Sequence, residues 1–146
     1  MEKSRMITYG YLEQVGDRTA EDFNGLLVQM TSDPDVMTTE RLNEILAAGT
    51  KILTAEDEGR IVGTASVLVL RQMRWYKAWL EDIVVDEAYR GQGIARHLME
   101  MSAQYAREQG CRNLNMTSKP GRENAWTLYE SLGYKHRDTN VFRLDL

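Results

Sequence analysis

Residues 81–95 read Glu-Asp-Ile-Val-Val-Asp-Glu-Ala-Tyr-Arg-Gly-Gln-Gly-Ile-Ala, an apolar run followed by a loop with two glycines. The loop, Arg90 to Ala95, follows a predicted strand and opens the longest amphipathic segment of the chain. Glycines there let the backbone approach a ligand closely, and the first N–H groups of a helix lack intrahelical partners. Such a helix end carries partial positive charge and binds phosphate oxygens. The stretch therefore predicts a phosphate-binding loop, although a glycine turn that merely starts a helix looks the same.

Two common phosphate-binding patterns do not fit this loop. The dinucleotide pattern G-x-G-x-x-G fails because Arg96 occupies the third glycine position. The P-loop pattern fails because no Gly-Lys-Ser/Thr follows. At this level the identity of the phosphate ligand stays open.

The segments around the loop predict a mixed α/β fold in one domain spanning residues 1–146. Apolar periodicity predicts helices at 19–30, 38–46, 93–109 and 124–132. Strands are predicted at 7–12, 51–55, 61–70, 78–85, 114–117, 134–136 and 141–146, with a hairpin turn at 57–60 and a possible bulge at Gly63. The first two helices come soon after the first strand, which places them where they can surround a site as well as cover a sheet.

The composition disfavours several classes of protein. The net charge of −4 disfavours a nucleic-acid-binding domain, which usually has a basic excess. The single cysteine, Cys111, excludes an internal disulfide, and no zinc-type spacing of Cys and His is present, so no metal site is expected. The first residues lack an apolar stretch, and no run approaches the length of a membrane span. The sequence therefore predicts a soluble cytoplasmic protein.

Three stretches together resemble the GNAT superfamily of acyl-CoA-dependent N-acyltransferases. They are the run Glu81 to Val85, the loop, and Ala125-Trp126-Thr127-Leu128-Tyr129-Glu130-Ser131-Leu132-Gly133-Tyr134. The loop matches the (Q/R)-x-x-G-x-(G/A) motif of that superfamily, and the last stretch resembles its A-x-x-L-Y-x-x-x-G-(F/Y) ending. The resemblance implies a GNAT fold, with a mostly antiparallel sheet of about six to seven strands and about four helices. A weaker resemblance is to glucosamine-6-phosphate N-acetyltransferases.

The resemblance implies that acetyl-CoA is the cosubstrate. The implied cofactor-binding residues are Ile83, Val84, Val85, Arg90, Gly91, Gln92, Gly93, Ile94, Ala95, Arg96 and Asn124. The strand residues would offer backbone groups to the pantetheine arm, while the loop and its arginines would hold the phosphates. The superfamily often has Asn seven residues before the tyrosine; here that position is Arg122, so the contact is assigned to Asn124 instead.

Acetyl transfer requires an uncharged amine, and Glu81 is the candidate base. Deprotonating a lysine-like amine at pH 7 costs about 4.6 kcal/mol, so removing this proton is a sizeable task. Strand alternation predicts that Glu81 shares a face with Ile83 and Val85, and that Asp82 lies on the other. With helices on both faces, two adjacent acids are not both ordinary surface residues. The alternative is that both lie near a strand end beside water.

Tyr129 is the candidate acid. A phenol can supply a proton to the departing thiolate, and the resemblance implies this role for the tyrosine of the Leu-Tyr-Glu segment. A core aromatic on an amphipathic helix is the alternative. The catalytic pair predicted from the sequence is therefore Tyr129 and Glu81.

A basic stretch with aromatic residues, 71–77, lies between two predicted strands. It has the composition of a site for an anionic ligand or RNA, but an exposed hairpin or a dimer contact is the favoured interpretation.

The leading hypothesis is an acetyl-CoA-dependent N-acetyltransferase in which a primary amine attacks directly within a ternary complex. Its expected partners are a small-molecule amine, with an amino sugar or another small amine favoured, and a second copy in a homodimer; nucleic acid and membrane are not expected. The alternative is a non-catalytic acyl-CoA-binding sensor or interaction module.

Overall fold

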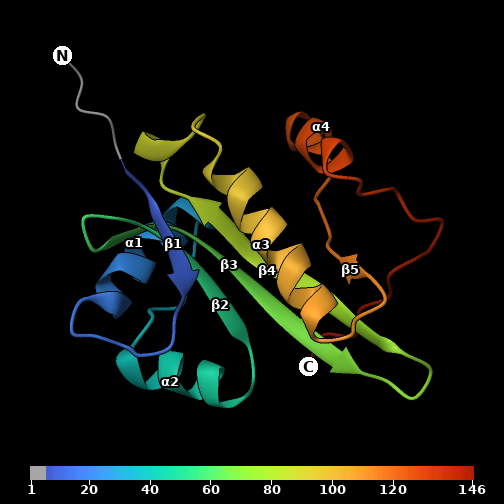
Figure 1. Ribbon diagram of the computed structural model, residues 1–146, viewed down its shortest axis with the longest axis horizontal. Helices are drawn as coiled ribbons and strands as arrows, with labels where there is room; N and C mark the ends of the chain where they lie inside the picture. Colours follow the sequence, from blue (N-terminus) through green and yellow to red (C-terminus); the bar gives the residue numbers. More distant parts are fainter. Residues whose placement is uncertain (1–5) are drawn as a thin grey trace.

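Apolar runs in the first 85 residues form most of a sheet, and the later amphipathic segments form helices beside it. The computed structural model describes residues 6–146. Its elements are β1 (Thr8–Tyr11), α1 (Thr19–Met30), α2 (Thr39–Ala47), β2 (Lys51–Asp57), β3 (Arg60–Arg71), β4 (Tyr76–Val85), a 3₁₀ turn (Glu87–Tyr89), α3 (Ile94–Glu108), β5 (Leu114–Asn115) and α4 (Glu123–Ser131). Figure 1 shows α3 running alongside β3 and β4, with α1 and α2 near β1 and β2, and α4 beyond α3. The mixed α/β class and the four predicted helices are confirmed.

The strands form one sheet in the order β1-β2-β3-β4-β5. The first three pairings are antiparallel, and β5 joins β4 in parallel. The predicted hairpin turn between β2 and β3 is confirmed, with Asp57 opposite Arg60. Its central residues, Glu58 and Gly59, have φ values of 49° and 82°. Two consecutive residues in the left-handed region match the right-handed twist of a two-residue hairpin.

Gly63 on β3 serves a close approach between the sheet and α3. A side chain there would place its Cβ 3.1 Å from Cγ2 of Ile94 and 3.4 Å from Cδ1 of Leu98. A register shift between β2 and β3 lies next to this residue, because Ala55 pairs with Gly63 and Glu56 with Ile61. The predicted irregularity at this position is therefore present, and the helix packs directly on it.

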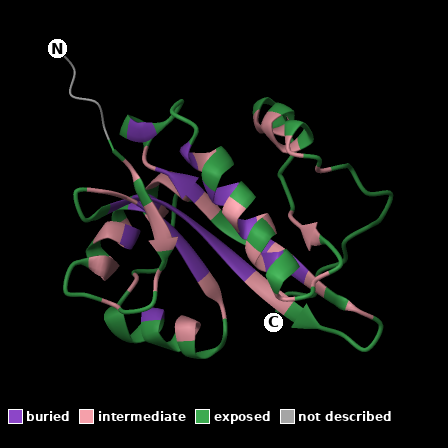
Figure 2. Ribbon diagram, in the orientation of Figure 1, coloured by how far each residue is buried: buried purple, intermediate pink, exposed green. Residues whose placement is uncertain are grey.

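Each face of the sheet has its own apolar core. The larger core joins the sheet to the inner face of α3 through residues such as Leu53, Leu80 and Leu98. The smaller core joins the other face to α1 and α2 through Phe23 and Leu42, among others. In Figure 2 the buried residues concentrate in the central strands and on one side of α3. Helices therefore cover both faces of the strand that carries Glu81.

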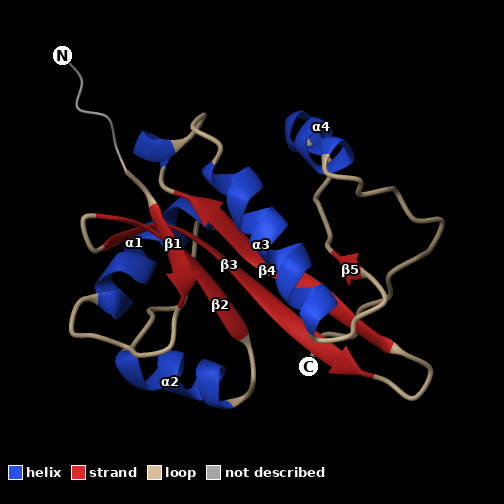
Figure 3. Ribbon diagram, viewed as in Figure 1, coloured by secondary structure: helices blue, strands red, loops and turns tan. Residues whose placement is uncertain are grey.

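The prediction of six to seven strands was wrong, because residues 134–136 and 141–146 form no strand and the sheet within residues 6–146 has five strands. Figure 3 shows this closing segment as loop after α4. Its alternating apolar side chains are exposed, 93% for Phe142 and 83% for Leu144. Alternation is a local signal, whereas a strand also needs a neighbour that pairs with it. The adjacent β5 is only two residues long, shorter than predicted, and offers little edge for pairing.

Candidate active site

The loop before α3 has the backbone that its glycines predict. Gly91 and Gly93 have φ values of 77° and 82°, and Gly93 directly precedes the first residue of the helix. No atom beyond the chain neighbours lies within 4 Å of a Cβ placed at either position, so conformation rather than space favours glycine here. The first helical hydrogen bond runs from His97 N to Gly93 O at 3.1 Å. The preceding N–H groups of the first turn are thus available to an anion.

A pocket of about 290 Å³ surrounds this loop, and we call it the loop pocket. Its lining residues are Val85, Tyr89, Arg90, Gly91, Gly93, Ile94, Ala95, Arg96 and Leu128. Two arginines are held in place at its walls: Arg90 Nε donates to Val85 O at 3.0 Å, and Arg96 Nη2 donates to Ser131 Oγ at 2.9 Å. The second bond ties the first turn of α3 to the end of α4. Most of the predicted cofactor residues are therefore gathered in one place.

Four predicted cofactor residues lie outside the lining of the loop pocket. Gln92 and Asn124 are exposed, Ile83 packs against the larger core, and Val84 lies on the opposite face of the sheet. The predicted contacts of Gln92 and Asn124 are made by side chains on the loop and on α4, whereas those of Ile83 and Val84 are made by backbone groups.

The edge of β4 that faces β5 is open over most of its length. Within residues 6–146, β5 pairs with β4 only at Ala78–Leu114 and Trp79–Asn115. Beyond Trp79, residues 80–85 continue along β4 without a partner strand on this side. Except for Val85 O, which accepts from Arg90 Nε, the outward backbone groups of this edge can bind an extended ligand that leaves the loop pocket.

A bulge in β4 changes the face on which Glu81 lies. Thr64 pairs with Val84 and Ser66 pairs with Glu81, so two residues of β4 stand opposite one residue of β3. Asp82, within the bulge, has φ of 51°. Glu81 and Asp82 therefore both line a pocket on the α1 and α2 face, while Ile83 and Val85 pack in the opposite core. The predicted alternation was wrong here because an extra residue reverses it.

This second pocket, which we call the carboxylate pocket, has a volume of about 300 Å³. It is lined by Phe23, Leu26, Leu27, Met37, Leu42, Ile45, Thr50, Ile52, Thr64, Ser66, Leu68, Glu81, Asp82 and Val84. The segment between α1 and α2 is fixed at its wall, because Asn24 Nδ2 donates to Met37 O at 3.0 Å and Met37 N donates to Asn24 Oδ1 at 2.7 Å. Sequence analysis placed α1 and α2 near a site but identified none of their side chains in it, since apolar helix residues look alike in a core and in a pocket wall.

Glu81 and Asp82 are both exposed, so the prediction that two adjacent acids are not both surface residues was wrong. Partial burial and the charge of Asp82 still act on the Glu81 carboxyl group. Desolvation is the larger effect, and each raises the pKa of Glu81 above its ordinary value. A carboxylate with a raised pKa is a stronger base than an ordinary one at the same pH. Raised carboxyl pKa values are common at functional sites, so this one marks Glu81 as a candidate.

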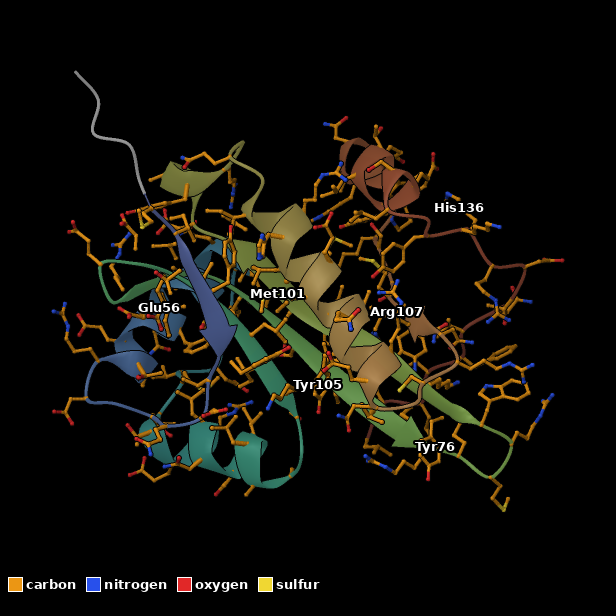
Figure 4. All side chains as sticks on the ribbon, in the orientation of Figure 1. Glu56, Tyr76, Met101, Tyr105, Arg107 and His136 are labelled. Atoms are coloured by element: carbon orange, nitrogen blue, oxygen red, sulfur yellow. The ribbon has the colours of Figure 1, made fainter. Side chains whose placement is uncertain are left out.

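Tyr129 lies on α4, on the side of the larger core, and lines neither pocket, although its neighbour Leu128 lines the loop pocket. Its ring centroid is 6.4 Å from that of Tyr134. Burial raises the pKa of Tyr134, and the hydroxyl of that residue is buried without a hydrogen-bond partner in the described chain. Arg107, labelled in Figure 4, acts in the opposite direction on this pKa from α3. The structure thus places Tyr129 on the side of the sheet that carries the larger core, and Glu81 in a pocket on the opposite face.

The basic stretch predicted between two strands forms the tip of the β3–β4 hairpin. The guanidinium groups of Arg74 and Arg112 lie 4.1 and 4.6 Å from the ring centroid of Trp75, and Met73 is fully exposed. Tyr76, at the start of β4, marks this end of the hairpin in Figure 4. The tip lines neither pocket and is an exposed hairpin, the interpretation favoured from the sequence.

Residues 6–146 contain neither a metal-binding cluster nor a membrane-spanning helix. No group of three or more His, Cys, Asp and Glu side chains in this range is placed to hold a metal ion. None of the helices described here combines the length and apolar character needed to cross a membrane.

Residues 18–134 match the Acetyltransferase (GNAT) family. The chain belongs to this family. GNAT acetyltransferases use acetyl-CoA as the acetyl donor, so acetyl-CoA is the cosubstrate of this chain. The resemblance predicted from the three sequence stretches is confirmed.

Relatives of this GNAT chain agree with the assignment. Glucosamine 6-phosphate N-acetyltransferase of Trypanosoma brucei brucei is 34% identical over 100 residues, which cover 66% of this chain and 65% of the relative. Human N-acetyltransferase 8B is 30% identical over 119 residues, covering 80% of this chain and 51% of the relative. The crystal structure of an acetyltransferase from Trypanosoma brucei superposes with a TM-score of 0.81 at 25% identity, covering 97% of this chain and 100% of the other. The chain spans about half to two thirds of the length of the curated relatives it matches.

Proposed function

We propose that this chain transfers the acetyl group of acetyl-CoA to a primary amine by direct attack in a ternary complex. The observation that carries the proposal is that β4 contributes to both pockets, Val85 to the loop pocket and Glu81 to the carboxylate pocket, while its edge between them is open. A donor held along this edge brings its thioester next to the carboxylate pocket. The two substrates then meet at the bulge.

The donor would be held mostly by backbone. The N–H groups of the first turn of α3, with Arg90 and Arg96, bind the pyrophosphate, and the open edge from Ile83 to Val85 binds the pantetheine arm. Gln92 and Asn124 lie exposed on the loop and on α4, where their amides reach the outer part of the donor.

The transfer itself forms one bond and breaks one. The amine nitrogen attacks the thioester carbonyl carbon, a C–N bond forms, and the C–S bond breaks. Glu81 accepts the proton that the amine loses, directly or through water, and the Tyr129 phenol gives a proton to the departing thiolate. Both side chains then return to their starting protonation states by exchange with solvent. The raised pKa of Glu81 supports its part in this scheme.

Release of free CoA from acetyl-CoA, measured against a panel of primary amines, tests the function. We expect CoA release with at least one amine in the panel. Glu81→Gln should reduce kcat/KM by about 100-fold, within the usual range for a general base. The loss should shrink as the pH falls through the raised pKa of Glu81, because the protonated carboxyl group of the original chain can no longer act as a base. A loss that does not change with pH would exclude Glu81 as the base.

Asp82→Asn is the matched control, because it alters a carboxylate in the same pocket. Removing the Asp82 charge relieves one cause of the raised Glu81 pKa, so the acid limb of the pH profile should move to lower pH. CoA binding without acetylation of any amine would favour the non-catalytic acyl-CoA-binding module instead.

We infer further that the chain acts in the cytoplasm as a homodimer. The exposed apolar side chains of the closing segment, Val141, Phe142, Leu144 and Leu146, support association, since contiguous exposed apolar surface marks protein contacts. Light scattering should give a molar mass twice that of the 16.8 kDa monomer. Replacing both Phe142 and Leu144 by Ser should reduce the measured mass to that of the monomer. Cell fractionation tests the location.

A further inference from the structure

The carboxylate pocket has an unusual combination of charge and polarity. Nine of its fourteen lining residues are aliphatic, aromatic or thioether side chains, and the only charged ones are Glu81 and Asp82. None of the described residues that line it is Lys, Arg or His. The pocket therefore offers a negative end and apolar walls, and no cation to bind an acidic group.

The polar atoms that remain in the lining are few and partly engaged. Thr64 Oγ1 already donates to Leu53 O at 2.8 Å, and both Thr64 and Ser66 are buried in the sheet. A sugar needs hydrogen-bond partners for several hydroxyl groups, because a buried hydroxyl without a partner is costly. Besides its two carboxylates, this pocket supplies only the hydroxyl groups of Thr50, Thr64 and Ser66, which are few for a sugar ring.

The two carboxylates face the same ligand because of the bulge. Without the extra residue at Asp82, normal alternation would place it on the other face of the sheet from Glu81. Together they disfavour a phosphate group, which carries close to two negative charges at neutral pH, and favour an ammonium group. The bulge thus sets the sign of charge that the pocket accepts.

The apolar walls are held in position before any ligand binds. Asn24 and Met37 exchange two hydrogen bonds across the segment between α1 and α2, and Asp22 Oδ2 accepts from Ile61 N at 3.1 Å. Because the wall is already fixed, its residues lose little conformational entropy when an apolar group binds. The pocket volume, about 300 Å³, is at the small end for ligand sites and suits a compact body.

We propose that the acceptor is a primary amine carried on a compact apolar or aromatic body, with its ammonium group at Glu81 and Asp82 and its body against Phe23, Leu27 and Met37. The proposal rests on the function proposed above. It separates this chain from its relative named for glucosamine 6-phosphate, a substrate with a phosphate dianion and several hydroxyl groups. Polyamines are disfavoured as well, since their further charges would meet the apolar walls.

CoA release with 2-phenylethylamine, n-hexylamine, spermidine and glucosamine 6-phosphate provides the test. We expect kcat/KM for 2-phenylethylamine to exceed that for glucosamine 6-phosphate by at least 100-fold, with spermidine between them. Preference for glucosamine 6-phosphate or spermidine would overturn the inference and leave the proposed function standing. If the chain binds CoA but none of these or other primary amines is acetylated, both fail.

Two substitutions at adjacent positions of α1 test whether the acceptor amine binds in the carboxylate pocket. Leu27→Lys puts a cation on the pocket wall, and kcat/KM for 2-phenylethylamine should fall at least tenfold. Val28→Lys introduces the same charge one residue further along α1, at a side chain that is 63% exposed and outside the pocket lining. It should change kcat/KM for 2-phenylethylamine less than twofold. Circular dichroism and the Kd for CoA show whether each variant folds and binds the donor. Equal effects of the two variants on a folded, CoA-binding protein would overturn the assignment of the pocket.

Discussion

The loop pocket and the carboxylate pocket share β4, but they are built in different ways. Eight of the nine residues that line the loop pocket lie between 85 and 96, and two of them, Gly91 and Gly93, offer only backbone. The carboxylate pocket draws on side chains from residue 23 to residue 84, spread over two helices, three strands and the connections between them. Donor binding should therefore tolerate most side-chain changes that keep the loop conformation. Acceptor choice should change with single side chains on α1 and α2.

The largest expected effect concerns the donor side. Tyr129→Phe should lower kcat by about 100-fold or more and leave the Kd for acetyl-CoA within twofold, because the phenol is needed only when the thiolate departs. CoA release measures the loss of kcat, and calorimetry measures the Kd for acetyl-CoA. Tyr134→Phe is the matched control, since it removes a neighbouring hydroxyl that is buried without a partner in the described chain. If Tyr134→Phe causes the larger loss of kcat, the acid has been assigned to the wrong tyrosine.

A second comparison separates loop conformation from general stability. Gly93 and Gly110 stand at the two ends of α3 with φ values of 82° and 80°, and an added Cβ meets nothing within 4 Å at either. Replacing either by Ala should cost about 1–2 kcal/mol of folding free energy, because the left-handed region is unfavourable for other residues. Only Gly93→Ala should also weaken CoA binding, by about tenfold. Calorimetric Kd values and urea unfolding check the pair; similar Kd values would remove the special role of the loop backbone.

The third prediction concerns stability on the acceptor side. Because the pKa of folded Glu81 is raised, its contribution to stability is fully present below the unfolded pKa and is lost as the pH rises through the folded value. Glu81→Gln carries no ionised form, so it should raise Tm relative to the original chain at pH 7 to 8. The gain should shrink as the pH falls towards 4. Glu13→Gln, at an exposed position outside both pockets, is the control for thermal melts across this range.

The smallest effects are expected at the starts of α1 and α4. Both helices have an arginine at the N-cap, Arg18 and Arg122, without a side-chain capping bond. Asn at either position should stabilise its helix by about 0.5–1 kcal/mol. α1 buries Phe23 and Leu26, so Arg18→Asn should raise global stability, whereas α4 buries none of its residues and Arg122→Asn should act locally. Urea unfolding and amide hydrogen exchange of α4 distinguish the two; a global gain from Arg122→Asn would show that α4 unfolds with the rest.

The sequence was informative wherever structure depends on neighbouring residues. The conformation before α3, the hairpin at Glu58 and Gly59, and the gathering of Arg90 to Arg96 around one pocket all follow from short segments. The bulge at Asp82 was not predicted, because its cause is the pairing of β4 with β3 and no glycine or proline marks it. The walls on α1 and α2 were not identified for a similar reason: Leu27 and Val28 are both aliphatic, and only packing decides which one lines the pocket.

Gly63 has a consequence for how this chain can vary over evolution. Ile94, which lies closest to a Cβ at position 63, is the first residue of α3 and also lines the loop pocket. A change to alanine would therefore move the helix end that holds the donor, although the two positions are thirty-one residues apart in the sequence. To admit even an alanine at 63, the Ile94 side chain would have to shift by a few tenths of an ångström. Sequence change in β3 is therefore restricted by the requirement that the start of α3 bind the cosubstrate.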